Sequence, residues 1–298
     1  MSGAFWQRVL DSQMAVPEDR PLPELTAELV TMLGSPDPLE RDGTALPVLT
    51  TWLTEGVYDD LLVSFGDSIA GGLRVGLGEQ GTDTVFRRSL SARVLETCIR
   101  RDNDARLVPV DAIMSWAESA LGWFTRERDV RGWVPGRGWA HAVANGADVV
   151  AALAASRHLE AGHLAVLLDV VAERLTQPTD RVWTDGEDDR LAYAVAAVLQ
   201  RNLVESPLLE HWLDSLADSA TGLRTDTGDA PPPPQVRNTS NFLRALYAHL
   251  SIGISPADPV TSFREAPAAR SDVLLALLAS IPRLTPWLYA GRASRRDG

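Results

Sequence analysis

The sequence has little cysteine, no long hydrophobic run and no export signal, and each of these absences excludes a class of protein. The single cysteine, Cys98, excludes an internal disulfide, and its place on an apolar helical stripe predicts a small core residue. The longest apolar run, Leu191 to Leu199, is far shorter than the roughly 20 residues that a membrane-spanning helix needs. Arg8 and Asp11 lie where a secretory signal would be apolar, which predicts a cytoplasmic protein with no membrane partner.

Positive charge is also scarce, because 28 arginines and no lysine face 40 acidic residues and leave a formal net charge of -12. A field of this sign repels phosphate backbones, and the short run Arg292, Arg295 and Arg296 is too small to reverse it. We therefore expect no nucleic-acid partner. The sequence also lacks a P-loop, a nucleophile elbow, a zinc-protease motif and a cysteine metal cluster, so it predicts neither a metal nor another cofactor.

Helical periodicity, in contrast, is present along most of the chain. Apolar residues recur at spacings of three and four in about a dozen segments, as in Leu22, Leu25, Leu29 and Leu33, whereas strand alternation is almost absent. Consecutive stripes begin about 20 to 27 residues apart, so two antiparallel helices take about the length of a HEAT or armadillo repeat. The pattern predicts an all-α protein built as an irregular HEAT-like stack of antiparallel helical hairpins, with a closed α/α toroid as the alternative.

One obvious break in this pattern lies at about residues 221–240. The segment combines turn-forming residues with four consecutive prolines, Pro231 to Pro234, and predicts an exposed extended loop between two helices. Because the helical pattern continues on both sides, we expect a single all-helical domain over residues 1–298.

The least ordinary stretch is residues 131–148, where a loop with three glycines and a proline leads into a helix predicted to begin near Trp139. On that helix His141, Asn145 and Asp148 have the spacing that places them on one face. Histidine and aspartate at this spacing can hold a divalent metal. However, the amide oxygen of Asn145 is a weak metal ligand, and the two good ligands that remain do not define a metal site. The remaining interpretations are hydrogen bonding to buried carbonyls, or a metal-free polar pocket.

Two tryptophans flank the glycine-rich loop. Trp133 and Trp139 can pack in the core, or they can form an apolar wall for a ligand and stack on an arginine such as Arg131. Asp129 lies just before the loop, where a helix-end ion pair is the simple interpretation.

A second cluster of charge lies at the start of the predicted helix that contains Leu191. Its acidic residues, Glu187 among them, precede Arg190 and are favoured in a first turn by the helix dipole. A pair of carboxylates can also act as general acid and base in glycoside hydrolysis, a role that depends on distances across a cleft.

Several segments together carry a resemblance to a known family. They are Asp129-Val130-Arg131-Gly132, Gly138-Trp139-Ala140-His141-Ala142, Val85-Phe86-Arg87-Arg88-Ser89, Glu187-Asp188-Asp189-Arg190-Leu191 and Asn241-Phe242-Leu243-Arg244. Over most of its length the chain resembles domain-of-unknown-function family 2785, whose members are bacterial all-helical proteins without an assigned activity. The resemblance therefore implies the fold and supplies no function.

The usual pattern of that family is Gly-Trp-Ala-His-Ala-x-Ala-His, followed by an Asp three residues on. This chain has Asn145 where the pattern has its second histidine. If the family binds a metal through the two histidines and the aspartate, the resemblance implies that this chain has lost a ligand and has an altered or inactive site.

We expect the protein to be a binding scaffold whose concave face or pocket holds a protein or a small ligand. The alternative is a hydrolase-like enzyme with an acid/base site at His141, Asp148 and Glu187, to which Asp129 adds a further candidate carboxylate. The candidate ligand-binding residues are Arg88, Arg131, Trp133, Trp139, Asn145, Arg190 and Arg244. A third hypothesis is that these groups form a purely structural polar network.

Overall fold

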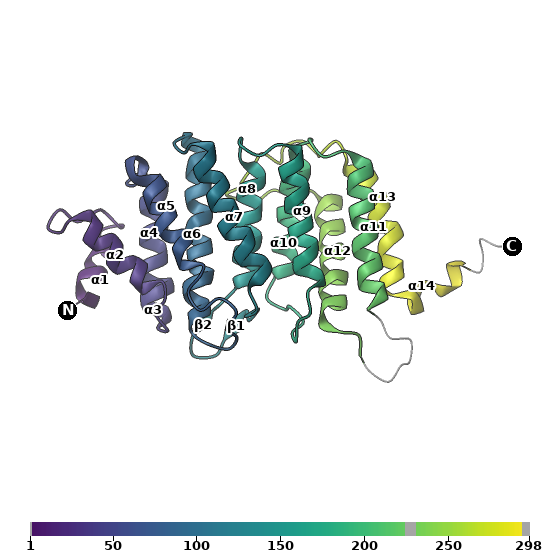
Figure 1. The fold of residues 1–298 in the computed structure, drawn as a ribbon, viewed down its shortest axis with the longest axis horizontal. Coiled ribbons are helices and arrows are strands. Elements are labelled where there is room, and N and C mark those ends of the chain that lie inside the picture. Colours follow the sequence, from purple (N-terminus) through teal and green to yellow (C-terminus); the bar gives the residue numbers. More distant parts are fainter. Residues whose placement is uncertain (1, 224–230, 294–298) are drawn as a thin grey trace. The chain divides into compact units, whose positions relative to one another are not determined.

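The computed structural model of the protein describes residues 2–223 and 231–293. Within these ranges the protein is all-α with one small two-stranded sheet, so the predicted fold class is confirmed (Figure 1). The chain divides into two compact units, residues 1–158 and residues 159–298. The finer predictions, a HEAT-like stack and a single domain, stay predictions.

The first unit is a set of helices gathered around one long central helix. Its helical elements are α1 (Ser2–Asp11), α2 (Leu22–Met32), α3 (Pro38–Glu40), the π-helical turn η1 (Arg41–Ala45), α4 (Leu46–Thr54), the 3-10 turn η2 (Asp59–Leu61), α5 (Leu62–Gly72), α6 (Thr84–Ala105), α7 (Val110–Arg126) and α8 (Ala142–Ala155). Helix α6 packs against α4, α5, α7 and α8, so it is the central element of this unit (Figure 1).

The predicted apolar stripe of α6 lies in the core of the first unit. Phe86, Leu90, Val94 and Cys98 are all buried, which confirms the prediction that the lone cysteine is a core residue. Burial raises the pKa of the Cys98 thiol far above its ordinary value, so the sulfur stays protonated and unreactive at neutral pH.

Two glycines allow the helices around this core to approach closely. A Cβ at Gly66 of α5 would lie 2.1 Å from the indole of Trp116, and one at Gly146 of α8 would lie 2.2 Å from the ring of Phe124. Such distances are shorter than atoms can pack. These positions therefore hold glycine for packing, in spite of its low helix propensity.

A short β-hairpin connects α7 to α8. Its strands are β1 (Trp133–Val134) and β2 (Gly138–Trp139), which pair antiparallel with Trp133 opposite Trp139. Gly136 and Gly138 have positive φ angles of 72° and 85°, which glycine adopts without strain. The hairpin lies close to η1, because the guanidinium of Arg41 donates to the carbonyl of Arg137 at 2.6 Å.

The prediction that a helix begins near Trp139 is wrong, because Trp139 belongs to β2 and α8 begins at Ala142. The strands take up residues that a helical first turn would otherwise use. Strands of two residues are too short to show alternation in the sequence, so this hairpin carried almost no pattern signal.

The regular elements of the second unit, within its described residues, are all helices. Its helices are α9 (Ala161–Thr176), α10 (Glu187–Gln200), α11 (Ser206–Gly222), α12 (Pro234–Ile252), α13 (Arg270–Leu284) and α14 (Pro286–Ala293). Helix α12 packs against α9, α10, α11 and α13, so it holds the central place that α6 has in the first unit.

The predicted loop at about residues 221–240 is shorter than expected. Helix α12 begins at Pro234, and residues 224–230 lie outside the described residues. A proline at the first position of a helix loses no hydrogen bond, because the amide there has no helical partner. The prediction of a loop as far as residue 240 is therefore wrong, and Gln235 and Asn238 are buried on α12.

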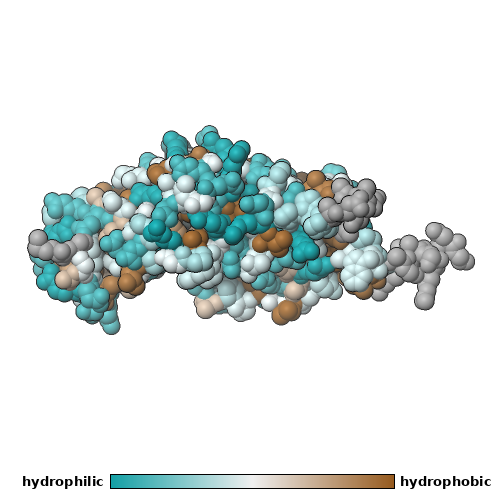
Figure 2. Space-filling view, turned by 90° about the horizontal axis from the view of Figure 1, so that it is seen from below, coloured by the Kyte–Doolittle hydropathy of each residue, from teal (hydrophilic) through white to brown (hydrophobic). Residues whose placement is uncertain are grey.

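Among the described residues, no helix has both the length and the apolar character needed to cross a membrane. On the face drawn in Figure 2, hydrophobic residues form small separate groups between hydrophilic ones. Scattered apolar residues of this kind are normal on a protein surface, so any recognition surface has to be found from individual side chains.

Candidate functional site

Two tryptophans on the β-hairpin are exposed to solvent. Trp133 and Trp139 are 52% and 41% exposed, and their rings meet edge to face with centroids 4.9 Å apart. Other tryptophans of the same unit, such as Trp116 and Trp123, are fully buried. The exposed pair offers a large, stiff apolar surface with few rotatable bonds.

His141 extends this surface. Its imidazole stacks on Trp139, with ring centroids 4.1 Å apart and planes 22° apart. The residue is the N-cap of α8 and has a left-handed backbone with φ 48° and ψ 32°, a conformation that is uncommon for residues other than glycine but is enriched in histidine, asparagine and aspartate. We call Trp133, Trp139 and His141 the aromatic surface.

The backbone of His141 joins the hairpin to the helix. Its N–H donates to the carbonyl of Arg131 at 3.1 Å, and its carbonyl accepts from the N–H of Asn145 at 2.9 Å. His141 is therefore not a member of the helical face that the sequence predicted. Only Asn145 and Asp148 of that group lie within α8.

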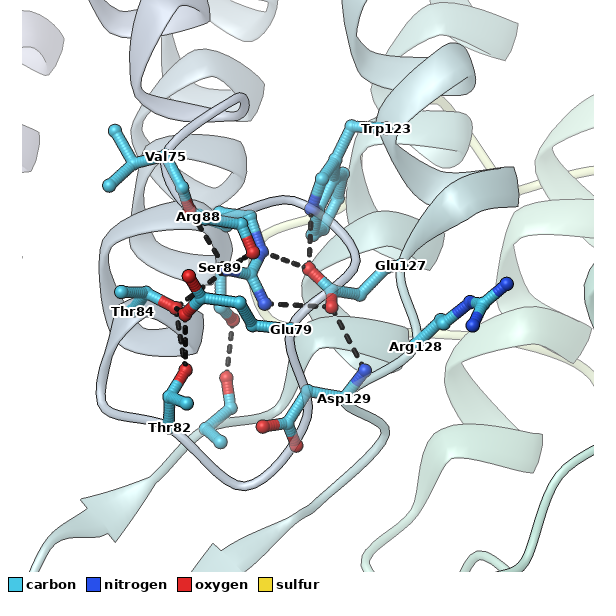
Figure 3. A network of polar contacts seen from close by, with 12 residues as sticks. Val75, Glu79, Thr82, Thr84, Arg88, Ser89, Trp123, Glu127, Arg128 and Asp129 are labelled. Atoms are coloured by element: carbon cyan, nitrogen blue, oxygen red, sulfur yellow. Dashed lines mark hydrogen bonds and ion pairs between the residues drawn. The ribbon is translucent and has the colours of Figure 1, made fainter.

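Arg88 of α6 and Glu127, which follows α7, form a buried ion pair close to the hairpin (Figure 3). Their side chains are 0% and 1% exposed. Arg88 donates from Nε and Nη2 to the two carboxylate oxygens of Glu127 at 2.5 and 2.9 Å. Its Nη1 donates to the carbonyls of Val75 and Gly76 and to the hydroxyl of Thr84.

The Glu127 carboxylate also accepts from two further groups (Figure 3). The indole N–H of Trp123 donates to it at 2.8 Å, and the backbone N–H of Asp129 donates at 2.9 Å. A buried charge is tolerated when it is paired and fully hydrogen-bonded, and both partners of this ion pair meet that condition. These contacts describe a structural role for Arg88, whose donors all reach protein acceptors.

Asp129 and Arg131 form a second ion pair at the base of the hairpin. The Asp129 carboxylate accepts from Nε and Nη2 of Arg131 at 2.8 and 2.7 Å, and from the N–H of Gly81 at 2.9 Å. Nη2 of Arg131 also donates to the carbonyl of Thr82 at 2.7 Å. The ion pair itself joins residues two positions apart, as expected for a local pair, whereas its bonds to Gly81 and Thr82 tie the loop before α6 to the hairpin.

Asn145 of α8 binds α6. Its Nδ2 donates to the hydroxyl of Ser89 at 2.8 Å, and that hydroxyl donates to the carbonyl of Ala140. The amide thus connects α8, α6 and the residue before His141. This agrees with the interpretation in which these polar groups satisfy buried carbonyls.

Asp148 belongs to a buried cluster that sequence reasoning missed. Glu96 of α6 is 2% exposed and Asp148 is 6% exposed, and Nη1 of Arg93 lies 2.8 Å from a Glu96 oxygen and 3.6 Å from an Asp148 oxygen. Desolvation by burial raises the pKa of Glu96, and the nearby Asp148 charge raises it further, against the opposing effect of Arg93.

A signal for Glu96 was present in the sequence. Ser89, Ala92, Glu96 and Ile99 recur at helical spacing, and all four are buried. This second stripe consists mostly of small and polar residues, so its hydrophobic periodicity is weak. A carboxylate within such a stripe indicates a buried charge that needs a partner.

The remaining candidates lie in the second unit. Glu187 is buried in the first turn of α10, and its carboxylate accepts from the N–H of Asp185 at 2.9 Å. Burial raises the pKa of Glu187, with the N–H donors acting against it. Arg190 on α10 and Arg244 on α12 are exposed. The acidic first turn follows the helix-dipole expectation.

No group of three or more histidine, cysteine, aspartate or glutamate side chains in the described ranges is arranged to hold a metal ion. The first unit instead presents two kinds of feature. Its charged candidates are paired inside the protein, while the two tryptophans of the aromatic surface are open to solvent and His141 is half-buried beside them.

The structure therefore defines the protein as an all-α protein with a small tryptophan-bearing hairpin. This hairpin is held beside a buried arginine–glutamate pair. The family model described as a protein of unknown function, DUF2785, matches residues 73–248. The chain belongs to this family, and the predicted resemblance is confirmed. The matched range covers the anchored hairpin, α8 and most of α12.

Searches of curated proteins and of solved structures found no significant match. Function therefore depends on the chemistry of this site and does not follow from the fold alone.

Proposed function

We propose that the protein is a binding scaffold that recognises a partner protein through the aromatic surface of Trp133, Trp139 and His141. The observation that carries this proposal is the exposure of both tryptophans, at 52% and 41%, on a hairpin whose base is tied to the core. Tryptophan is enriched among the residues that dominate binding energy at protein interfaces. A surface that is already rigid loses little conformational entropy when a partner binds.

The charged groups support the same proposal. Arg88 and Arg131 hold the hairpin in place through Glu127 and Asp129. At the tip of the hairpin, Arg137 is 45% exposed and can add a polar contact at the rim of an interface. The aromatic surface as an apolar centre and Arg137 as a polar rim match the usual organisation of a binding surface.

The contacts of the candidate acid/base groups favour structural roles over the alternative hydrolase. The imidazole of His141 stacks on Trp139, and the backbone of this residue occupies the N-cap position of α8. Asp148 packs in the cluster with Arg93, and Glu187 accepts a backbone N–H at the start of α10. Each of these groups therefore has a local reason for its position.

The proposal includes the finer sequence predictions, namely a HEAT-like stack of helical hairpins acting in the bacterial cytoplasm. Its partner is not a nucleic acid, because the net charge of -12 opposes contact with phosphate backbones.

Selection of binders from a random peptide display library, using the full chain as bait, tests the proposal. Peptides selected by the unmodified protein should bind Trp133→Ala and Trp139→Ala at least about tenfold more weakly, since truncation of an interface hot spot has an effect of this size or larger.

The matched control is Trp287→Ala, because Trp287 is 76% exposed and lies on α14 in the second unit. It should bind the same peptides with unchanged affinity. Peptides that bind all three variants equally well would show that the aromatic surface is not the recognition site.

A further inference from the structure

A cavity of about 210 Å³ lies in the second unit, against the C-terminal ends of α10 and α12. Residues 253–269, between α12 and α13, form its other wall. It is smaller than the pockets of roughly 300–1,000 Å³ that hold drug-sized ligands, so it suits a compact molecule. Its apolar lining includes Ala196, Leu250, Ile254, Phe263 and Pro267.

The wall formed by residues 253–269 is irregular but held in place by hydrogen bonds. Two of its backbone N–H groups donate to the side chains of Tyr193 and Asn202, at 3.0 and 2.7 Å. At its far end, Arg270 donates from Nε to the carbonyl of Leu250 at 2.7 Å. Long irregular segments in compact proteins are often functional, and a wall fixed in advance lowers the entropic cost of binding.

Gln200 supplies a polar group inside this cavity. Its Nε2 donates to the carbonyl of Glu265 at 2.9 Å, and because a carbonyl can only accept, this bond fixes which way the amide points. Its Oε1 is buried and has no hydrogen-bond partner among the described residues. A buried amide oxygen in this state is costly, and an N–H donor on a bound molecule would satisfy it.

Two charges of opposite sign accompany this acceptor. Arg264 and Glu265 both line the cavity and are both exposed, so they lie where it opens to solvent. A guanidinium binds a carboxylate through charge-assisted hydrogen bonds, and a carboxylate binds an ammonium group in the same way. The cavity therefore combines an anion-binding group, a cation-binding group, a buried acceptor and an apolar wall.

We propose that the second unit binds a free apolar α-amino acid in this cavity. The ligand's carboxylate contacts Arg264, its ammonium group donates to Oε1 of Gln200 and to Glu265, and its side chain packs on Phe263. This site is independent of the aromatic surface, because every residue named lies in the second unit.

Isothermal titration calorimetry of the full chain with L-phenylalanine and L-leucine tests the proposal. We expect saturable binding of at least one of them. Arg264→Ala and Gln200→Leu should each weaken binding at least about tenfold, because each removes a partner of a charged group. Phenethylamine, which lacks the carboxylate, and 3-phenylpropionate, which lacks the ammonium group, should bind at least about tenfold more weakly than phenylalanine.

Two further variants make the result decisive. Ala196→Leu fills the cavity from α10 without removing a hydrogen bond, so it should abolish binding even if Gln200→Leu disturbs the wall. Arg237→Ala removes an exposed arginine near the start of α12, far along the helix from the cavity, and should leave binding unchanged.

Three results would overturn the proposal. They are the absence of saturable binding by both amino acids, equal affinity for 3-phenylpropionate and phenylalanine, and unchanged affinity in Arg264→Ala or Ala196→Leu.

Discussion

Both oxygens of the Glu127 carboxylate accept from the Arg88 guanidinium, through Nε at 2.5 Å and Nη2 at 2.9 Å, with neither side chain open to solvent. These residues are 39 positions apart in the sequence. The bond therefore connects α6 to the segment that leads into the hairpin.

Removing one partner of this ion pair should destabilise the protein strongly. Arg88→Met leaves the Glu127 carboxylate buried without its cation, and we expect a loss of about 3–5 kcal/mol of unfolding free energy in urea denaturation. Replacing both residues, in Arg88→Met/Glu127→Leu, should recover much of this loss because no buried charge remains.

The exposed pair Arg137–Asp83 provides the control, since its side chains are 45% and 44% exposed. Arg137→Ala should cost about 1 kcal/mol or less. Equal effects of Arg88→Met and Arg137→Ala would contradict the structural role of the buried pair.

The stability of the protein should fall above about pH 4.5 in a way that depends on Glu96. Burial raises the pKa of this carboxyl above its ordinary value of 4.5, so the folded state still holds a proton where the unfolded state has released it. Stability contributed by that proton is lost as the pH rises through the raised pKa. Glu96→Gln removes this loss, and its stability relative to the unmodified protein should increase between pH 4.5 and neutral pH.

Glu79 gives the opposite sign and serves as the comparison. Hydrogen bonds from Thr84 and Thr82 lower its pKa, so its contribution is present above about pH 4.5 and is lost as the pH falls. In urea denaturation over a pH series, Glu79→Gln should lose stability relative to the unmodified protein as the pH rises to about 4.5. A pH-independent difference for Glu96→Gln would count against a raised pKa.

Adding a methyl group at Gly146 should destabilise the first unit. A Cβ there would lie 2.2 Å from the ring of Phe124, and overpacking of this kind costs roughly 1–3 kcal/mol. Gly162 in α9 has open space around its Cβ position, so Gly162→Ala should instead stabilise the protein by about 0.4–1 kcal/mol. Thermal unfolding of the two variants distinguishes these outcomes by sign.

Truncation of an exposed tryptophan should cost far less than truncation of a buried one. Trp116 is 0% exposed and donates to Asp67 at 2.8 Å, so Trp116→Ala should cost about 3–5 kcal/mol. Trp133→Ala truncates a side chain that is 52% exposed and packs edge to face on Trp139, and we expect a loss of about 1 kcal/mol or less in urea denaturation. A large loss in Trp133→Ala would identify the hairpin tryptophan as a structural element.

The helical fold could be predicted because its signal is periodic and long. The α6 stripe of Phe86, Leu90, Val94 and Cys98 illustrates this, since burial of one helix face repeats every turn. The proline run was harder to interpret, because a proline marks loops and the first turn of helices equally well. Helix α12 begins at Pro234, so the loop predicted as far as residue 240 includes the first turns of this helix.

The candidate site was predicted in part. The sequence singled out Trp133, Trp139 and His141, and the structure places these three in contact. It did not predict that Arg88 pairs with Glu127 or that Glu96 lies beside Asp148, because both contacts join elements that are far apart in the chain. Local spacing constrains neighbours on one helix, whereas contacts between helices depend on how the helices pack.

The hairpin is fixed at its base and open at its tip. Asp129 and Arg131 bind the loop before α6, whereas Pro135, Gly136 and Arg137 at the tip are exposed. The side chains of Pro135 and Arg137 can therefore change with little effect on folding, whereas Gly136 is held to glycine by its positive φ and a change at Asp129 or Arg131 breaks an ion pair that anchors the hairpin.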